Sequence, residues 1–175
     1  MYADNNNGNE VLKNILLGST MGEVSYNETF SLIFNKSVKD ESSGFFKNRR
    51  LMLIIDSSCW FGEKEQWNSL VSKYHELNRT KGNDYVFEME DSILAYGLIK
   101  LRSGNLTEVD NVEFNNDFLQ IHFESGDLLT IENSSESDYS WVLEDIEEND
   151  NQKRMSVFYQ GCEIIMKNIP DIFNG

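Results

Sequence analysis

The stretch that decides the fold is NDFLQIHFESGDLLTIENSS, residues 116–135. Its first half alternates apolar and polar side chains, and a period of two is that of a strand with one buried face. The turn signal ESGD follows, in which Gly126 can readily adopt positive φ. A second apolar run, LLTIE, comes directly after it. The whole stretch therefore predicts an antiparallel hairpin.

His122 is the histidine of this hairpin, and the alternation places it on the same side of the strand as Gln120. The opposite side carries Leu119, Ile121 and Phe123, which are the predicted core residues. This pattern predicts an outward-facing strand histidine rather than a catalytic one.

Two other segments have clear patterns. Residues 49–58 read RRLMLIIDSS, and the unbroken apolar run from Leu51 to Ile55 predicts a strand with both faces covered. Residues 63–78 read EKEQWNSLVSKYHELN, in which apolar side chains recur at steps of three and four residues. That period is typical of an amphipathic helix, and it is the one main helix that the sequence predicts.

The N-terminal part of the chain gives weaker signals. Residues 1–9 are polar and are predicted to be disordered. Residues 10–17, EVLKNILL, fit either a short amphipathic helix that ends at Gly18 or a strand. Residues 37–48 have the composition of a loop.

The chain also contains two similar segments, about residues 10–62 and 93–146. Each has a glycine-containing segment, an edge strand, an aromatic-ended strand, an apolar strand and a tryptophan near serines, DSSCWF in one and SSESDYSWVL in the other. This pattern predicts a degenerate repeat of one β unit. Two such units pack into one sheet or a split barrel more readily than into separate domains. The predicted fold is a single α+β domain over residues 1–175, with a mostly antiparallel sheet or split barrel and one main helix.

The chain is strongly acidic, with 30 Asp and Glu against 15 Lys and Arg and a net charge of −15. Nucleic acid and anionic membrane surfaces repel such a chain, and the basic cluster KNRR at 47–50 is too short to reverse this. A large net negative charge often serves only to keep a protein soluble. The alternative is a basic partner, because opposite fields accelerate association and select the partner.

The acidic residues that could contact such a partner follow the hairpin. The run from 144 to 150 is ordinarily a solvated loop, and the alternative is a docking surface for a cationic partner. The predicted partner-binding residues are Glu132, Glu136, Asp138, Glu144, Asp145, Glu147, Glu148 and Asp150.

The sequence contains no catalytic or metal-binding motif. It has no P-loop, dinucleotide fingerprint, nucleophile elbow or metal-ligand quartet, and DNNNGNE at 4–10 has its glycine one position too early for an EF-hand loop. Cys59 and Cys162 share no C-x-x-C spacing and suit reduced, buried thiols. A dyad of either cysteine with His75 or His122 stays open, because such pairing is spatial. We predict no catalytic residue, no metal and no cofactor.

The expected location is the cytosol. The N-terminal residues MYADNNNGNE do not resemble a signal peptide, and no apolar run approaches the length of a membrane helix.

The second half resembles a recurrent pattern in small bacterial proteins: a strand, a glycine turn, a second strand, a serine-containing gap and a tryptophan strand. The residues that carry it here are Asp117, Leu119, Ile121, Phe123, Gly126, Leu129, Ile131 and Trp141. LMLIIDSSCWF, at 51–61, resembles the companion copy, although a polar insertion at 35–49 replaces its usual glycine turn. Many proteins with this pattern are similar to the immunity partners of polymorphic or contact-dependent growth-inhibition toxins.

The resemblance implies a non-enzymatic function, that of an immunity protein that binds a cognate basic toxin domain and occludes its active site. Nuclease toxins must hold phosphates and are commonly basic, so an acidic inhibitor is their electrostatic complement. An EndoU-like ribonuclease is the toxin considered within that class. The alternatives are an acidic nucleic-acid mimic that occupies the site of a DNA-binding enzyme, and a small enzyme that uses Cys59 or Cys162.

Overall fold

The computed structural model describes residues 5–39, 44–80, 89–104, 106–134, 138–148, 150 and 152–173. Within these residues the chain is an α+β fold with one six-stranded and one four-stranded antiparallel sheet. The predicted class and the antiparallel pairing are confirmed. The two sheets are not closed into a barrel, so the split-barrel alternative is wrong.

Helix α1, Asn5–Leu16, begins earlier than the sequence predicts. The prediction of disorder over residues 1–9 is wrong for residues 5–9, while residues 1–4 lie outside the described part. Asn9 Oδ1 accepts a hydrogen bond from the Phe114 backbone N–H at 3.0 Å, and a Cβ on Gly8 would lie 2.8 Å from the Ile164 side chain. These contacts with distant strands hold a polar segment helical, which local sequence does not reveal.

The first half of the chain continues with four strands: β1 (Thr20–Asn27), β2 (Thr29–Lys39), β3 (Phe46–Ile55) and β4 (Cys59–Phe61). The predicted loop over residues 37–48 is wrong at both ends, because β2 and β3 stay paired as far as Lys39 and Phe46. Residues 40–43 lie outside the described part. β3 is the predicted apolar strand, and its two edges pair with β2 and with β8 (Trp141–Asp145). The prediction that both of its faces are covered is wrong, because Leu51, Leu53 and Ile55 are buried whereas Met52 and Ile54, on the other face, are only half-buried.

The second half repeats this order. Helix α3 (Met89–Ser103) precedes β5 (Val109–Phe114), β6 (Phe118–Phe123), β7 (Leu128–Glu132) and β8. The predicted hairpin is β6–β7, with Gly126 at φ 83° in its turn. Leu119, Ile121 and Phe123 are buried as predicted. His122 lies on the other side, where its imidazole is half-buried beside Glu113 rather than fully exposed.

The two halves exchange their tryptophan strands. The sheet order is β1-β2-β3-β8-β9-β10 in one sheet and β4-β7-β6-β5 in the other, so each half gives three strands to its own sheet and one to its partner's. The helices are exchanged as well, since α1 packs on β5 and α3 packs on β1. An isolated bridge between Thr20 and Glu108 joins the starts of β1 and β5. Each half thus contains a helix followed by four strands in the same order.

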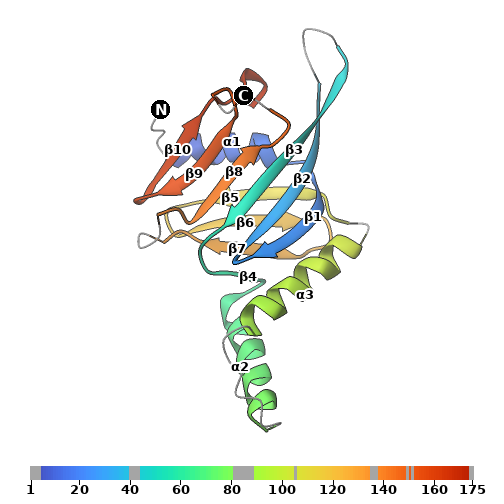
Figure 1. Ribbon diagram of the computed structural model, residues 1–175, viewed down its shortest axis with the longest axis vertical. Helices are drawn as coiled ribbons and strands as arrows, with labels where there is room; N and C mark the ends of the chain where they lie inside the picture. The colour runs from blue at the N-terminus through green and yellow to red at the C-terminus, as the bar shows by residue number, and fades with distance from the viewer. Residues whose placement is uncertain are drawn as a thin grey trace.

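Only the second half carries a C-terminal extension. Strands β9 (Ser156–Gln160) and β10 (Glu163–Lys167) widen the first sheet, and a 3₁₀ turn, η1 (Asp171–Phe173), follows. Figure 1 shows the six-stranded sheet in front of the four-stranded one, with α1 behind and the other helices at the lower end. The sheets meet through aromatic contacts of Phe114 with Trp141 and Tyr159, at centroid distances of 6.0 and 5.9 Å.

The predicted helix over 63–78 is α2, Lys64–Thr80, but the described residues form three α-helices instead of one main helix. Trp67 and Val71 of its apolar stripe are buried, whereas Leu70, Tyr74 and Leu77 are exposed. Helix α3 was missed because its apolar residues lie nearly all around it, which weakens the helical period. No helix of the described residues combines the length and the apolar character that crossing a bilayer requires.

Candidate functional site

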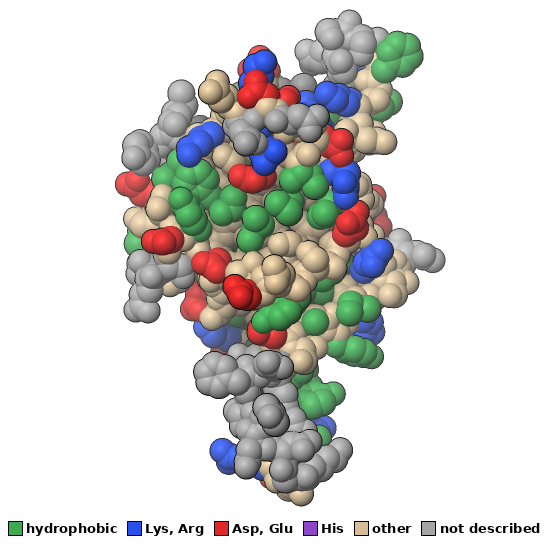
Figure 2. All heavy atoms as spheres, in the orientation of Figure 1, with side chains coloured by type: hydrophobic (Ala, Val, Ile, Leu, Met, Phe, Trp, Pro, Cys, Tyr) green, Lys and Arg blue, Asp and Glu red, His purple; other side chains and the backbone are tan. Residues whose placement is uncertain are grey.

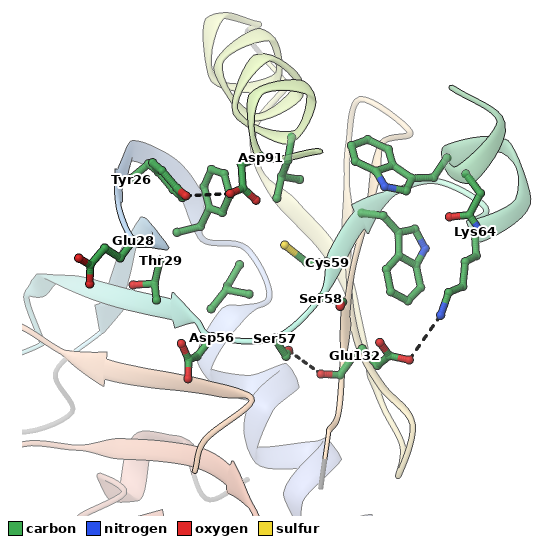
Figure 3. Close-up of a pocket in the computed structure, with 16 residues that line it drawn as sticks. Tyr26, Glu28, Thr29, Asp56, Ser57, Ser58, Cys59, Lys64, Asp91 and Glu132 are labelled. Atoms are coloured by element: carbon green, nitrogen blue, oxygen red, sulfur yellow. Dashed lines mark hydrogen bonds and ion pairs between the residues drawn. The ribbon is translucent and has the colours of Figure 1, made fainter. Parts of the chain in front are cut away.

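A cleft of about 320 Å³ opens where the first half of the chain passes from one sheet to the other. Its base is the three-residue link 56–58 between β3 and β4 (Figure 3). The turn between β1 and β2, the first turns of α2 and α3, and the end of β7 form the walls. Because these segments come from both halves of the chain, the cleft exists only in the folded protein.

Four carboxylates line this cleft: those of Glu28, Asp56, Asp91 and Glu132. Asp91 accepts a hydrogen bond of 2.7 Å from Tyr26 Oη. Glu28 and Asp56 are exposed, and no ion pair or hydrogen bond joins their carboxylates to another side chain of the described residues. Two acidic groups thus face solvent at the mouth of a cavity, where an opposite charge can approach them.

The chain's own ammonium group shows what one corner of the cleft binds. Lys64 Nζ lies 3.4 Å from Glu132 Oε1 and 4.6 Å from the centre of the Trp60 ring. A carboxylate together with an aromatic face is a favourable environment for a cation. Lys64 itself occupies this corner, whose ring and carboxylate suit a positively charged side chain.

The turn that carries Glu28 has an unusual backbone. Glu28 is the single residue between β1 and β2, and its φ is 64°, in the left-handed region that favours glycine. Holding a non-glycine residue there costs of order 1 kcal/mol or more. The turn places a carboxylate beside the cleft at the expense of local strain.

Cys59 also lines the cleft, but its environment suppresses nucleophilic chemistry. Burial, together with the charge of Asp91, raises the pKa of its thiol to about 12. The thiolate is the reactive form, so at neutral pH Cys59 is an inert thiol. Among the described residues, no contact joins Cys59 or the exposed Cys162 to His75 or His122.

One of the two hydroxyl groups of the link, that of Ser57, forms a structural hydrogen bond. Ser57 Oγ donates a hydrogen bond of 2.6 Å to the Glu132 backbone carbonyl, which fixes the link and does not activate the oxygen. Within the described residues, no three His, Cys, Asp or Glu side chains converge as metal ligands. The cleft carboxylates are spread around its walls, an arrangement that fits an extended organic cation such as a lysine or arginine side chain.

The structure distributes the predicted partner-binding residues over separate places. Glu132 is at the cleft and Asp138 is exposed in the link before β8, while Glu136 lies outside the described residues. The others lie at the opposite end of β8 from that link. That group is Glu144, Asp145, Glu147, Glu148 and Asp150.

Most of the acidic residues at this end of β8 already form ion pairs with Arg or Lys of the same chain. Asp145 is only 1% exposed and forms an ion pair of 2.5 Å with Arg49, so it supports the fold from inside. Glu144 lies 3.8 Å from Arg154, and Asp150 lies 3.5 Å from Lys153. Glu147 lies 3.9 Å from Arg50, and the Glu148 carboxylate accepts the Asp150 backbone N–H. These partners reduce the negative field that the loop presents.

Sequence reasoning missed Glu28, Asp56 and Asp91 as cleft residues. The signal that could have found Asp56 is the DSS link between an apolar strand and a tryptophan, which marks a sheet crossing. Glu28 and Asp91 have no such signal, because the turn and the helix that carry them meet only through the fold. No known protein family, curated protein or solved structure matches the chain.

Proposed function

We propose that the protein is a cytosolic immunity protein that binds a cognate basic toxin domain, a nuclease by preference, and occludes its active site. The observation that carries the proposal is the acidic cleft, in which Glu28 and Asp56 face solvent beside an aromatic–carboxylate corner. The net charge of −15 supports it, because a nuclease surface that holds phosphates is its electrostatic complement.

The inhibitor acts by binding alone. Its negative field steers the basic domain toward the cleft from beyond contact distance, and at physiological salt this steering fades over about 8 Å. A lysine or arginine of the partner then enters the cleft and meets carboxylates in place of the phosphates of its substrate. An EndoU-like ribonuclease is one toxin of this kind.

Two alternatives have less support. A cysteine enzyme needs an accessible thiolate, and the raised pKa of Cys59 opposes it. A nucleic-acid mimic needs carboxylates spaced along one line like phosphates. Instead, Glu144, Glu147 and Asp150 each lie beside an Arg or Lys of the same chain, which partly neutralises them.

Co-expression with a basic toxin domain, sought among the proteins encoded beside this chain, tests the proposal. We expect restored growth and a complex that co-purifies at low salt and associates more slowly as salt rises. Glu28→Gln with Asp56→Asn should weaken both effects, whereas Glu108→Gln with Glu124→Gln, which removes two exposed carboxylates elsewhere, should not. Rescue of growth without any complex, at any salt concentration, would contradict direct inhibition.

Replacement of both cysteines by serine separates binding from catalysis. We expect Cys59→Ser with Cys162→Ser to protect cells as the native chain does. Loss of protection in a double variant that still folds, as circular dichroism would show, would favour the enzyme.

A further inference from the structure

The six-stranded sheet has an outer face that no other helix or strand of the described residues covers. Figure 1 shows this face toward the viewer, with the four-stranded sheet and α1 behind it. Helices α2 and α3 pack against β4 and β1 instead. A sheet face turned to solvent usually carries polar side chains, so the side chains found here are informative.

A row of apolar side chains crosses this face. The register aligns one residue from each of four adjacent strands, and the neighbours of these residues along the strands point into the core. The row consists of Ile54, Val142, Phe158 and Ile165. Met52 and Ile33, paired with each other, lengthen the apolar area toward β2. Figure 2 shows hydrophobic side chains gathered over the middle of the face.

The centre of the row is Phe158. Its ring packs edge-on against Tyr139 at a centroid distance of 5.3 Å, and Lys167 Nζ lies 4.9 Å from the ring centre. Tyr139 itself is 40% exposed. Phe158 itself is only 7% exposed, because Tyr139 and Lys167 cover it, so Tyr139 presents the accessible part of this aromatic pair. Tyrosine is among the residues that most often dominate binding energy in protein interfaces.

Carboxylates lie along part of the border of this apolar centre, together with Lys167 and with Arg154, the ion-pair partner of Glu144. Glu144 follows Val142 on the same face, and Asp138 immediately precedes Tyr139. Asp56 follows Ile54 by two residues, and beside it is Glu28, so the edge of the face continues into the acidic cleft. Figure 3 shows Glu28 just before β2 and Asp56 just after β3, at the same end of this pair of strands. An apolar centre with a charged rim is the usual anatomy of a protein-binding surface.

We propose that this outer face docks a basic protein domain, which covers the apolar row and places cationic side chains on the rim and in the cleft. The inference rests on the proposed function for the partner's identity and adds the surface that it contacts. A second copy of the chain would bring a carboxylate rim against another, with −15 on each side. An anionic lipid surface is opposed by the same rim.

Two peptides test the chemistry of the face without any toxin. One is a labelled peptide of about ten residues that alternates leucine and lysine, and the other alternates serine and lysine with the same charge. Fluorescence anisotropy at physiological salt should give at least about tenfold tighter binding for the leucine peptide, because only it offers an apolar face together with cations.

Matched variants locate that preference. Ile54→Thr with Val142→Thr keeps the β-branched shape and should reduce the leucine preference to about twofold or less. Leu77→Gln with Ile99→Gln removes exposed apolar side chains from α2 and α3 and should leave the preference unchanged. For the rim, Asp56→Asn, Asp138→Asn and Glu144→Gln together should weaken both peptides. Glu76→Gln, Glu108→Gln and Glu124→Gln together remove the same number of carboxylates elsewhere and should weaken the binding of both peptides less.

The outcomes separate this inference from the proposed function. Equal binding of the two peptides, or a leucine preference that survives Ile54→Thr with Val142→Thr, overturns the docking face even where the native chain rescues growth. A leucine preference confined to the face supports it even where the neighbouring toxin domain proves not to be the partner. Sedimentation velocity measures the oligomeric state. If the native chain is a dimer and Ile54→Thr with Val142→Thr converts it to a monomer, the face is an interface between two copies of the chain, and the proposal is overturned.

Discussion

In both halves of the molecule the chain crosses from one sheet to the other just before its tryptophan strand. One crossing leaves an open cleft and the other is closed. In the first half the link 56–58 leaves a cleft with solvent-facing carboxylates. In the second half the crossing is closed at the described residues on either side of it: Trp141 is 0% exposed, and its Nε1–H donates to Asn133 Oδ1 at 2.8 Å. Ser140 Oγ accepts from Ser134 N and donates to the Ser134 carbonyl.

The difference comes from the element that the chain forms after each tryptophan strand. After β8 the chain adds β9, and Trp141 pairs with Tyr159 as an interior member of a wide sheet. After β4 the chain leaves the sheet as α2, so Trp60 stays at an edge, where Lys64 covers its ring. A repeated β unit thus provides a stable closed crossing and an open one, and the candidate site lies where the repeat is broken.

The largest expected effect on the free energy of unfolding comes from a substitution at the closed crossing. Trp141→Ala removes a fully buried indole and leaves Asn133 without its partner, and we expect a loss of about 3–5 kcal/mol in the free energy of unfolding. Trp60→Ala removes a ring that touches the cleft on one side, and we expect roughly half that loss. Urea denaturation monitored by circular dichroism measures both. Equal losses would mean that the two crossings are energetically alike.

The second prediction compares a carboxylate at the far end of β8 with one at the open crossing. Asp145→Ala leaves the half-buried Arg49 without its ion-pair partner, and we expect a loss of about 2–4 kcal/mol. Asp56→Ala removes an exposed carboxylate and should change the free energy of unfolding by less than about 0.5 kcal/mol. The same two variants should rank in the opposite order for partner binding. If Asp145→Ala weakened binding in a chain of unchanged stability, the division between structural and functional acids would fail.

The parts of the fold that the sequence predicts are those with a local period. The β6–β7 hairpin, β3 and α2 follow from alternation or helical spacing, and the repeat follows from two tryptophans near serines. The cleft does not follow, because Glu28 and Asp91 are 63 residues apart and meet only after the halves exchange strands and helices. Asp145 looked like a loop acid in sequence, and only the register of β3 with β8 shows that it is buried near Arg49.

The third prediction concerns the helix that precedes each unit. At the end of α1, Lys36 Nζ donates to the Asn14 and Leu17 carbonyls at 2.6 Å each, whereas at the end of α3 the neutral Ser103 hydroxyl donates to the Ile99 carbonyl. Burial lowers the pKa of Lys36 from 10.5 to about 8. Between these values the unfolded chain holds a proton that the folded chain has released, so this group raises stability as pH rises.

The comparison of native chain and Lys36→Met isolates this contribution from other groups that titrate in the same range. We expect the native chain to gain about 1–2 kcal/mol relative to the variant between pH 8 and pH 10.5, after allowance for partial solvent exposure. Ser103→Ala should show no such pH dependence. A flat difference between native chain and Lys36→Met across this range would show that folding does not lower the pKa of Lys36.

The smallest expected effect sharpens the comparison at the strained turn of the open crossing. Glu28→Gly relieves the φ of 64° but adds freedom to the unfolded chain, and these opposing terms should leave a net gain of under about 0.5 kcal/mol. Glu28→Gln keeps the strain and loses the charge, so it should not gain stability. Both variants lack the carboxylate and should weaken the basic partner equally. If only Glu28→Gly impaired binding, the turn would act through its backbone shape and not through its charge. Asp56 and Asp91 would then be the carboxylates of the cleft that bind the partner.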